Sequence, residues 1–165
     1  MQKIEIHAVK MVDLAAIMRI ENKDFSAAEA ASPQAMAERI KIIPETFLGA
    51  YLGEKLLGYL VGPAIRQRYL SDDLYQRVTV NLPTAQAPYQ AVLSLAVAPI
   101  FQNQGIGSQL LKTLAQQAKR QRRRGLTLTC LTKLVVFYQK NDFIDEGISS
   151  SKHAGEQWHN MFLTL

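Results

Sequence analysis

The sequence predicts a single α/β domain with a mixed sheet, and three observations support this class. The chain has 165 residues, of which 48% are hydrophobic and 20% charged, so it has enough apolar material for one compact core. Short strands joined by a hairpin dominate the first half, whereas the second half has a strand–helix–strand order. There is no internal repeat or low-complexity segment. We therefore expect residues 1–165 to form one domain.

The N-terminal segment is expected to contain one strand followed by two helices. Residues 4–8 alternate between apolar and polar or charged side chains, which is typical of a short strand with one buried face. Asp13 is placed to cap a helix over residues 14–21, where apolar side chains recur at helical spacing. Ser32-Pro33 opens the second helix, with serine as N-cap and proline in the first turn. Pro44 ends it.

The middle of the chain is expected to form a hairpin, an irregular segment and a buried strand. Strands over residues 46–52 and 56–61 are joined at Gly53-Glu54. Between residues 62 and 89 the pattern decays, and prolines gather there. Such an insertion is either a lid or binding loop or simply disordered. Residues 91–98 are almost wholly apolar, which predicts a central strand buried on both faces.

The C-terminal segment is expected to contain a long helix, a strand, a short helix and a final strand or pair of strands. The long helix covers about residues 105–124, with Gly125 as its C-terminal cap. A strand over 126–131 and a helix over 134–140 follow. Residues 156–165 complete the chain as a strand or a pair.

Composition excludes several classes of function. The single cysteine, Cys130, excludes a disulfide scaffold and a cysteine-based zinc site, and we expect no metal. No apolar run approaches the ~20 residues of a membrane helix, so we expect a cytoplasmic protein. The net charge of +5 comes largely from the basic run at residues 119–124. This run is interpreted as a solvated helix end, with contact to a cofactor phosphate or to nucleic acid as alternatives.

The segment from Leu95 to Leu111 carries the main chemical signal. A strand runs into Pro99, and Gly105 and Gly107 then stand at the start of the long helix. The first turn of a helix leaves amide N–H groups unpaired, and glycine lets an anion approach the backbone. We therefore expect a pyrophosphate-sized anion around residues 104–108. Leucine at position 110 disfavours a dinucleotide fingerprint, and no Walker lysine is present. A plain turn with glycines for packing is the alternative.

The sequence 102–107, Gln-Asn-Gln-Gly-Ile-Gly, resembles the pyrophosphate loop of the GNAT superfamily of N-acetyltransferases. Residues 137–143, Phe-Tyr-Gln-Lys-Asn-Asp-Phe, are similar to a second motif of that family. The resemblance implies a mostly antiparallel central sheet with helices on both faces. It also implies acetyl-CoA as cofactor, with its pantetheine arm paired to the strand before the loop.

The resemblance assigns roles to particular residues. Tyr138 is the expected acid that protonates the departing thiolate. The expected cofactor-binding residues are Leu95, Ala96, Val97, Gln102, Asn103, Gln104, Gly105, Ile106, Gly107 and Ser108. Asp142 replaces a glycine of the second motif, and aspartate tolerates the left-handed backbone better than most residues.

Three further segments, residues 20–25, 47–52 and 153–161, resemble the branch that contains arylalkylamine N-acetyltransferases. Two histidines of the vertebrate enzymes in that branch are replaced here by Ala91 and Leu93. The proton-relay route of those enzymes is therefore not expected.

The base that deprotonates the acceptor amine is not fixed by the sequence. Glu21, at a helix end, is the candidate, with an ordinary surface carboxylate as the alternative. His153 and His159 are expected to be structural. Trp158 is expected either to pack in the core or to line an acceptor pocket. Cys130 is expected to be a buried hydrophobe, since no histidine is spaced to activate it.

The leading hypothesis is an acetyl-CoA-dependent N-acetyltransferase acting on a small-molecule amine or a peptide N-terminus. A non-catalytic acyl-CoA sensor and a basic nucleic-acid-binding module are the alternatives, the latter less favoured. We expect a monomer or a homodimer and no membrane partner.

Overall fold

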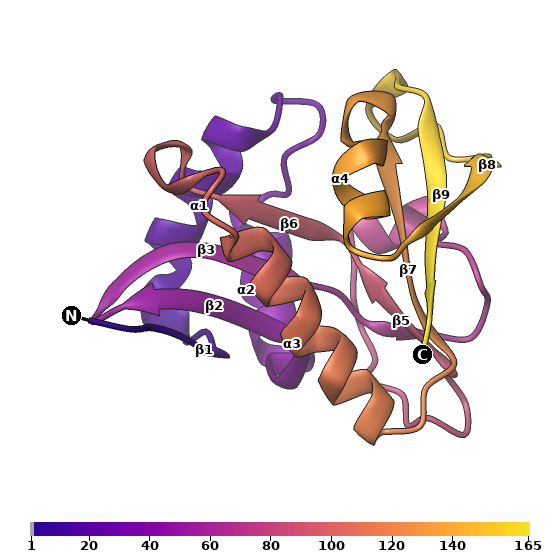
Figure 1. Cartoon of the computed structure of the whole chain (residues 1–165), viewed down its shortest axis with the longest axis horizontal. Coiled ribbons are helices and arrows are strands. Elements are labelled where there is room, and N and C mark those ends of the chain that lie inside the picture. The colour runs from indigo at the N-terminus through magenta and orange to yellow at the C-terminus, as the bar shows by residue number, and fades with distance from the viewer. Residues whose placement is uncertain (1) are drawn as a thin grey trace.

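The computed structural model describes residues 2–165 and contains two sheets that diverge from each other (Figure 1). The first sheet has the order β1-β2-β3-β6, and the second has the order β4-β5-β7-β9-β8. The strands of the first are β1 (Ile4–Ala8), β2 (Phe47–Leu52), β3 (Lys55–Val61) and β6 (Ser94–Val97). Those of the second are β4 (Ala64–Ile65), β5 (Tyr89–Val92), β7 (Gly125–Leu131), β8 (Ile144–Ile148) and β9 (Trp158–Thr164). Within residues 2–165 only β5 and β7 pair in parallel, so the sheets are mostly antiparallel, as predicted.

Helices cover both faces of the first sheet, which confirms the predicted fold class. These helices are α1 (Leu14–Asp24), α2 (Pro33–Ile42) and α3 (Ile106–Arg120), whereas α4 (Val135–Lys140) packs on β8 and β9 of the second sheet. On one face α1 and α2 enclose a core that includes Ile17, Met36 and Tyr59. On the other face the core contains Leu110 and Leu114 of α3 together with strands of both sheets. α3 lies in front of β2 and β3 (Figure 1), and its buried side chains share a core with strands of both sheets, so it joins the sheets into one body.

Several local predictions from the N-terminal half are confirmed. The hairpin joins β2 and β3 through Gly53, whose φ of 61° requires the left-handed region that glycine tolerates. Ser32 caps α2, because its hydroxyl accepts a hydrogen bond from the Ala35 amide at 3.0 Å. Pro44 begins a separate 3-10 turn after the helix has ended.

The prediction of one continuous strand over residues 91–98 is wrong. The chain passes from the second sheet to the first at Leu93, so β5 and β6 belong to different sheets. The Ala91 amide donates to Pro63 at 2.8 Å, whereas the Leu93 amide donates to Val61 at 2.7 Å. A run of apolar residues identifies buried strand but does not show where the strand changes partner.

Two predicted caps are also wrong. The Asp13 carboxylate accepts hydrogen bonds from the Lys10 amide at 2.8 Å and the Tyr51 hydroxyl at 2.9 Å, so it closes the 3-10 turn before α1. Gly125 is the first residue of β7 and not a helix cap. A side chain there would collide with the Phe162 ring, and the left-handed turn after α3 lies at Arg122 instead.

The segment from 62 to 89 is more ordered than its sequence suggests. It contains β4 and a 3-10 turn over Asp72–Tyr75. Arg123, from the basic run, is buried and donates to the Ala87 carbonyl at 2.5 Å, which ties this segment to the end of α3. The rest of the run is exposed, as expected for a solvated helix end.

The final strand is β9, and its partner β8 was not predicted. β8 is an edge strand whose Ile144 and Ile148 are exposed, so it lacks the alternation of a half-buried strand. Within residues 2–165 no helix is long and apolar enough to cross a bilayer.

Candidate active site

A cavity lies where β6 and β7 diverge, between α1 on one side and α4 on the other. The cavity is lined by Glu21, Phe25, Glu29, Ala30, Ala31, Arg39, Tyr75, Val92, Leu93, Ser94, Leu95, Leu128, Thr129, Cys130, Leu131, Leu134, Tyr138, His153 and Trp158. It therefore brings the two predicted catalytic residues, Glu21 and Tyr138, together with one predicted cofactor residue, Leu95.

Tyr138 lies on α4 and is 7% exposed. The rings of Phe137 and Phe143 contact it edge-on, with centroids 5.0 and 5.5 Å away, and fix the orientation of its ring. The following turn contains Asp142 with φ of 70°, so the left-handed conformation predicted there is present. Burial raises the pKa of Tyr138 above its ordinary value of 10.0, so the phenol keeps its proton at neutral pH.

Glu21 is buried, not a surface carboxylate. Its side chain accepts hydrogen bonds from the Ala31 amide at 2.8 Å and from the hydroxyl groups of Tyr59 and Ser94. Burial raises its pKa above 4.5, although these hydrogen bonds and the charge of Arg39 partly oppose that effect. A carboxyl group with a raised pKa is a stronger base than an ordinary glutamate.

Sequence reasoning missed Arg39. This residue of α2 is 1% exposed, and its guanidinium donates to the Tyr75 carbonyl at 2.9 Å. Desolvation lowers its pKa, while the charge of Glu21 raises it. Its position on the buried side of α2 follows the helical spacing of Met36 and Ile40, but an arginine in that pattern is usually assigned to the surface.

An aromatic wall formed by Tyr75, His153 and Trp158 closes one side of the cavity. The rings of Tyr75 and His153 stack with centroids 4.0 Å apart, and the Trp158 indole donates to the His153 carbonyl at 2.9 Å. The hydroxyls of Tyr75 and Thr129 are 2.5 Å apart. The segment from 62 to 89 thus contributes to the site through Tyr75. His153, expected to be structural, also lines the cavity.

The outer edge of β6 faces the divergence between the sheets. Among the strands of the described part of the chain, β6 pairs only with β3. The Ala98 amide donates to the Leu57 carbonyl, so the alternate amides of Leu95 and Val97 point to the unpaired edge. The Val97 amide donates to the Asp24 carboxylate at 3.0 Å. Asp24 was not among the predicted site residues.

The predicted pyrophosphate loop follows β6 and ends at the first turn of α3. Gly105 precedes the helix with φ of 82°, and a side chain placed on it would meet no atom within 4 Å. No side chain caps the helix, so the amides of its first turn have no capping side-chain partner. Gly107 differs, because a Cβ there would lie 3.3 Å from the Phe137 ring. Gly105 leaves space for a ligand, whereas Gly107 serves packing.

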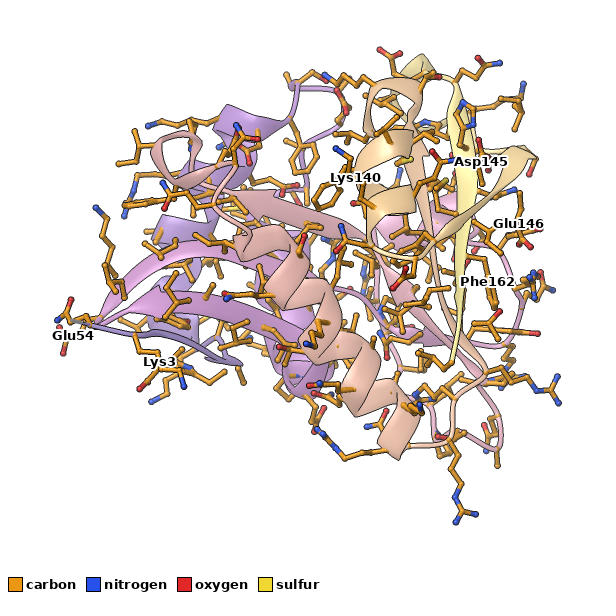
Figure 2. All side chains as sticks on the ribbon, in the orientation of Figure 1. Lys3, Glu54, Lys140, Asp145, Glu146 and Phe162 are labelled. Atoms are coloured by element: carbon orange, nitrogen blue, oxygen red, sulfur yellow. The ribbon has the colours of Figure 1, made fainter. Side chains whose placement is uncertain are left out.

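Cys130 and His159 do not form a nucleophilic pair. Cys130 is 2% exposed, and burial raises its pKa to about 12. The His159 imidazole instead lies 3.1 Å from the Asp145 carboxylate and 3.0 Å from the Thr132 hydroxyl. Glu146 follows Asp145 on the edge strand β8 (Figure 2), and its carboxylate forms an ion pair with Arg68 at 2.7 Å. Within residues 2–165 no group of three metal-ligating side chains is found.

The profile of the acetyltransferase (GNAT) domain matches residues 44–145, which is more than half of the chain. The chain belongs to the GNAT acetyltransferase family. As a member of this family it is an acyltransferase that acts on amino groups and takes acetyl-CoA as its acyl donor. The open edge of β6 and the uncapped start of α3 fit such a donor, because they offer backbone N–H groups to an amide-rich arm and a diphosphate.

Solved structures share the fold of this GNAT domain at low identity. Ard1 from Thermoplasma volcanium is 16% identical, with a TM-score of 0.76 and 98% and 97% of the two chains covered. The ribosomal-protein-S18-alanine N-acetyltransferase from Escherichia coli is 18% identical, with a TM-score of 0.68 and 98% and 94% covered. Arabidopsis thaliana Naa50, in complex with the bisubstrate analogue CoA-Ac-MVNAL, is 14% identical, with a TM-score of 0.73 and 98% and 99% covered. No curated protein sequence matches significantly.

Proposed function

We propose that this GNAT domain transfers an acetyl group directly from acetyl-CoA to the primary amine of a small molecule or a peptide N-terminus. The observation that carries the proposal is the single cavity that holds Tyr138, Glu21 and the unpaired edge of β6. Peptide N-terminal acetylation is favoured by similar folds such as the S18-alanine enzyme. An arylalkylamine- or polyamine-like acceptor is favoured by the aromatic wall and the buried carboxylate.

In this proposal the pantetheine arm of acetyl-CoA lies along Leu95, Ala96 and Val97, and its diphosphate binds at the loop. The loop residues are Gln102, Asn103, Gln104, Gly105, Ile106, Gly107 and Ser108. The Leu95 amide, on the open edge and at the cavity, is placed to donate to the thioester oxygen. A donor at that position stabilises the negative charge that develops on this oxygen during acyl transfer.

The acceptor amine must be neutral before it attacks the thioester carbon. At pH 7 the deprotonation of an ammonium group with a pKa of about 10.4 costs about 4–5 kcal/mol. Glu21 lowers this cost by attracting the ammonium group and by receiving its proton. The new C–N bond forms, the C–S bond breaks, and the Tyr138 hydroxyl gives its proton to the departing thiolate. The second proton that the amine nitrogen loses as the amide forms restores the Tyr138 phenol, and the proton held by Glu21 passes to water.

Substitution of Tyr138 by phenylalanine tests the proposal. We expect kcat for acetyl transfer to fall by about 100-fold, which is typical of losing a general acid. CoA affinity should change less than about twofold, because the proposed binding contacts of CoA with β6 and with the loop are not removed. Release of free thiol with a panel of arylalkylamines, polyamines and peptides measures turnover, and calorimetry measures CoA binding.

Tyr69→Phe is the matched control, because Tyr69 lies in an exposed loop and bonds to Glu146. It should leave kcat unchanged. An unchanged rate in Tyr138→Phe would remove Tyr138 from the mechanism. CoA binding without thiol release for any amine of the panel would contradict the proposed classes of acceptor.

A further inference from the structure

Both polar backbone groups of Val97 are engaged by side chains in this structure. The Val97 amide donates to Oδ2 of Asp24 at 3.0 Å. Nε2 of Gln102 donates to the Val97 carbonyl at 3.0 Å and to Oδ1 of Asp24 at 3.3 Å. These three residues therefore form a closed ring of hydrogen bonds on the outer edge of β6. We call this ring the Asp24 latch.

The latch joins two parts of the molecule that flank the proposed cofactor groove. Asp24 is the last residue of α1, and Gln102 is the first residue of the proposed pyrophosphate loop. Val97 lies between them, at the end of the open strand edge. A ligand chain that pairs with this edge needs the same Val97 amide that Asp24 occupies, because a backbone N–H has one proton to donate.

The latch bond is strong enough to affect binding. A hydrogen bond from a backbone amide to a carboxylate is charge-assisted and roughly twice as strong as a bond between neutral groups. The Asp24 carboxylate is partly buried, and burial raises its pKa, while the hydrogen bonds from Val97 and Gln102 favour the charged form and oppose that effect. Its negative charge at the start of the pyrophosphate loop would repel a diphosphate.

We propose that Asp24 is an autoinhibitory latch, which closes the cofactor edge of β6 in the free protein and is displaced when acetyl-CoA binds. This inference rests on the proposed placement of acetyl-CoA along β6. The free energy needed to open the latch is subtracted from the binding free energy, so Asp24 weakens the affinity for the cofactor. Most substitutions in a binding groove weaken binding, whereas loss of this carboxylate strengthens it.

Calorimetric titration of CoA into Asp24→Ala, Asp24→Asn and the unmodified protein tests the latch. We expect Asp24→Ala to bind about tenfold more tightly, which corresponds to a hydrogen bond with a charged partner. Asp24→Asn should show a smaller gain, because its side-chain oxygen still accepts from Val97 but carries no charge. This second variant also keeps the shape of aspartate if the alanine variant folds poorly.

Glu54→Gln is the matched control for net charge. Glu54 lies in the exposed β2–β3 turn, at the far end of the first sheet (Figure 2), and its neutralisation should not change CoA affinity. If the unmodified protein binds CoA and neither Asp24 variant binds it more tightly, the latch is overturned. If neither the unmodified protein nor any variant binds CoA, the proposed cofactor site itself fails.

Discussion

At the residue scale, the buried pair of Glu21 and Arg39 distinguishes this cavity from an ordinary polar pocket. Both side chains are 1% exposed, yet no carboxylate of residues 2–165 lies within ion-pair distance of Arg39. Each uses other partners: Glu21 accepts from Ala31, and Arg39 donates to Tyr75. Glu21 thus ties α1 to the loop before α2, and Arg39 ties α2 to the segment that contains Tyr75.

Replacement of Glu21 by glutamine should change how stability depends on pH. The folded-state pKa of Glu21 is raised above its unfolded value of 4.5, so the folded protein holds this proton more tightly. The resulting contribution to stability is fully present below pH 4.5 and is lost as pH rises through the folded-state pKa. Glutamine cannot ionise and removes this loss. Denaturant unfolding measured from pH 4.5 upward should show that the free energy of unfolding of the unmodified protein falls relative to that of Glu21→Gln.

The control for this experiment is Ser32→Ala, in which neither side chain ionises, so the difference from the unmodified protein should stay constant with pH. A Glu21→Gln difference that is equally constant would show that the carboxyl is not desolvated in solution.

The sequence predicts Glu21 and Tyr138 as site residues because each lies within a recognisable local pattern. It does not predict Asp24 or Arg39, whose roles depend on tertiary contacts. Asp24 meets Val97 across 73 positions of chain, and no local signal marks such a contact. Arg39 contacts Tyr75, which lies in the segment from 62 to 89, where the sequence has no clear periodicity.

At the scale of elements, caps and periodicity decide most of the predicted boundaries. α2 begins where Ser32 and Pro33 predict, because both residues satisfy needs of a first helical turn that involve no other part of the fold. The break at Leu93 is different. It is set by the divergence of two sheets, and both halves of the apolar run remain strands.

Loss of the Ser32 cap should destabilise the protein measurably. Ser32→Ala removes the hydrogen bond to the Ala35 amide, and we expect a loss of about 1 kcal/mol in the free energy of unfolding. Ser32→Asp restores an acceptor at the helix N-terminus and should stay within roughly 0.5 kcal/mol of the unmodified protein. Urea denaturation checks both variants. Equal losses in both would show that another property of Ser32 matters.

At the scale of the whole molecule, the two sheets are joined by α3 and by the short link at Leu93, and a cavity lies between them. The core under α3 contains residues from both sheets, including Leu60 and Leu128. The cavity lies on the side where β6 and β7 separate. A ligand bound along β6 would therefore contact both halves and stabilise the folded state as a unit.

Acetyl-CoA should accordingly raise the melting temperature of the protein. At a concentration of about 100 times Kd the expected gain is roughly 5–10 °C. S-acetylpantetheine, which lacks the diphosphate, should give a much smaller gain at the same concentration, because it does not reach the start of α3. Differential scanning calorimetry measures both. Equal shifts with the two ligands would contradict anion binding at residues 102–108.

The change of sheet at Leu93 also affects the order in which the protein can fold during synthesis. The first sheet has all its strands once Val97 has left the ribosome, because β1, β2 and β3 precede β6. β4 and β5 emerge before Leu93, but β5 can pair with β7 only after β7, which ends at Leu131, has been synthesised. The second sheet is complete only when β9 has been added. In nascent chains the first sheet should therefore form before the second, and the edge of β5 should be exposed to chaperones until β7 has been synthesised.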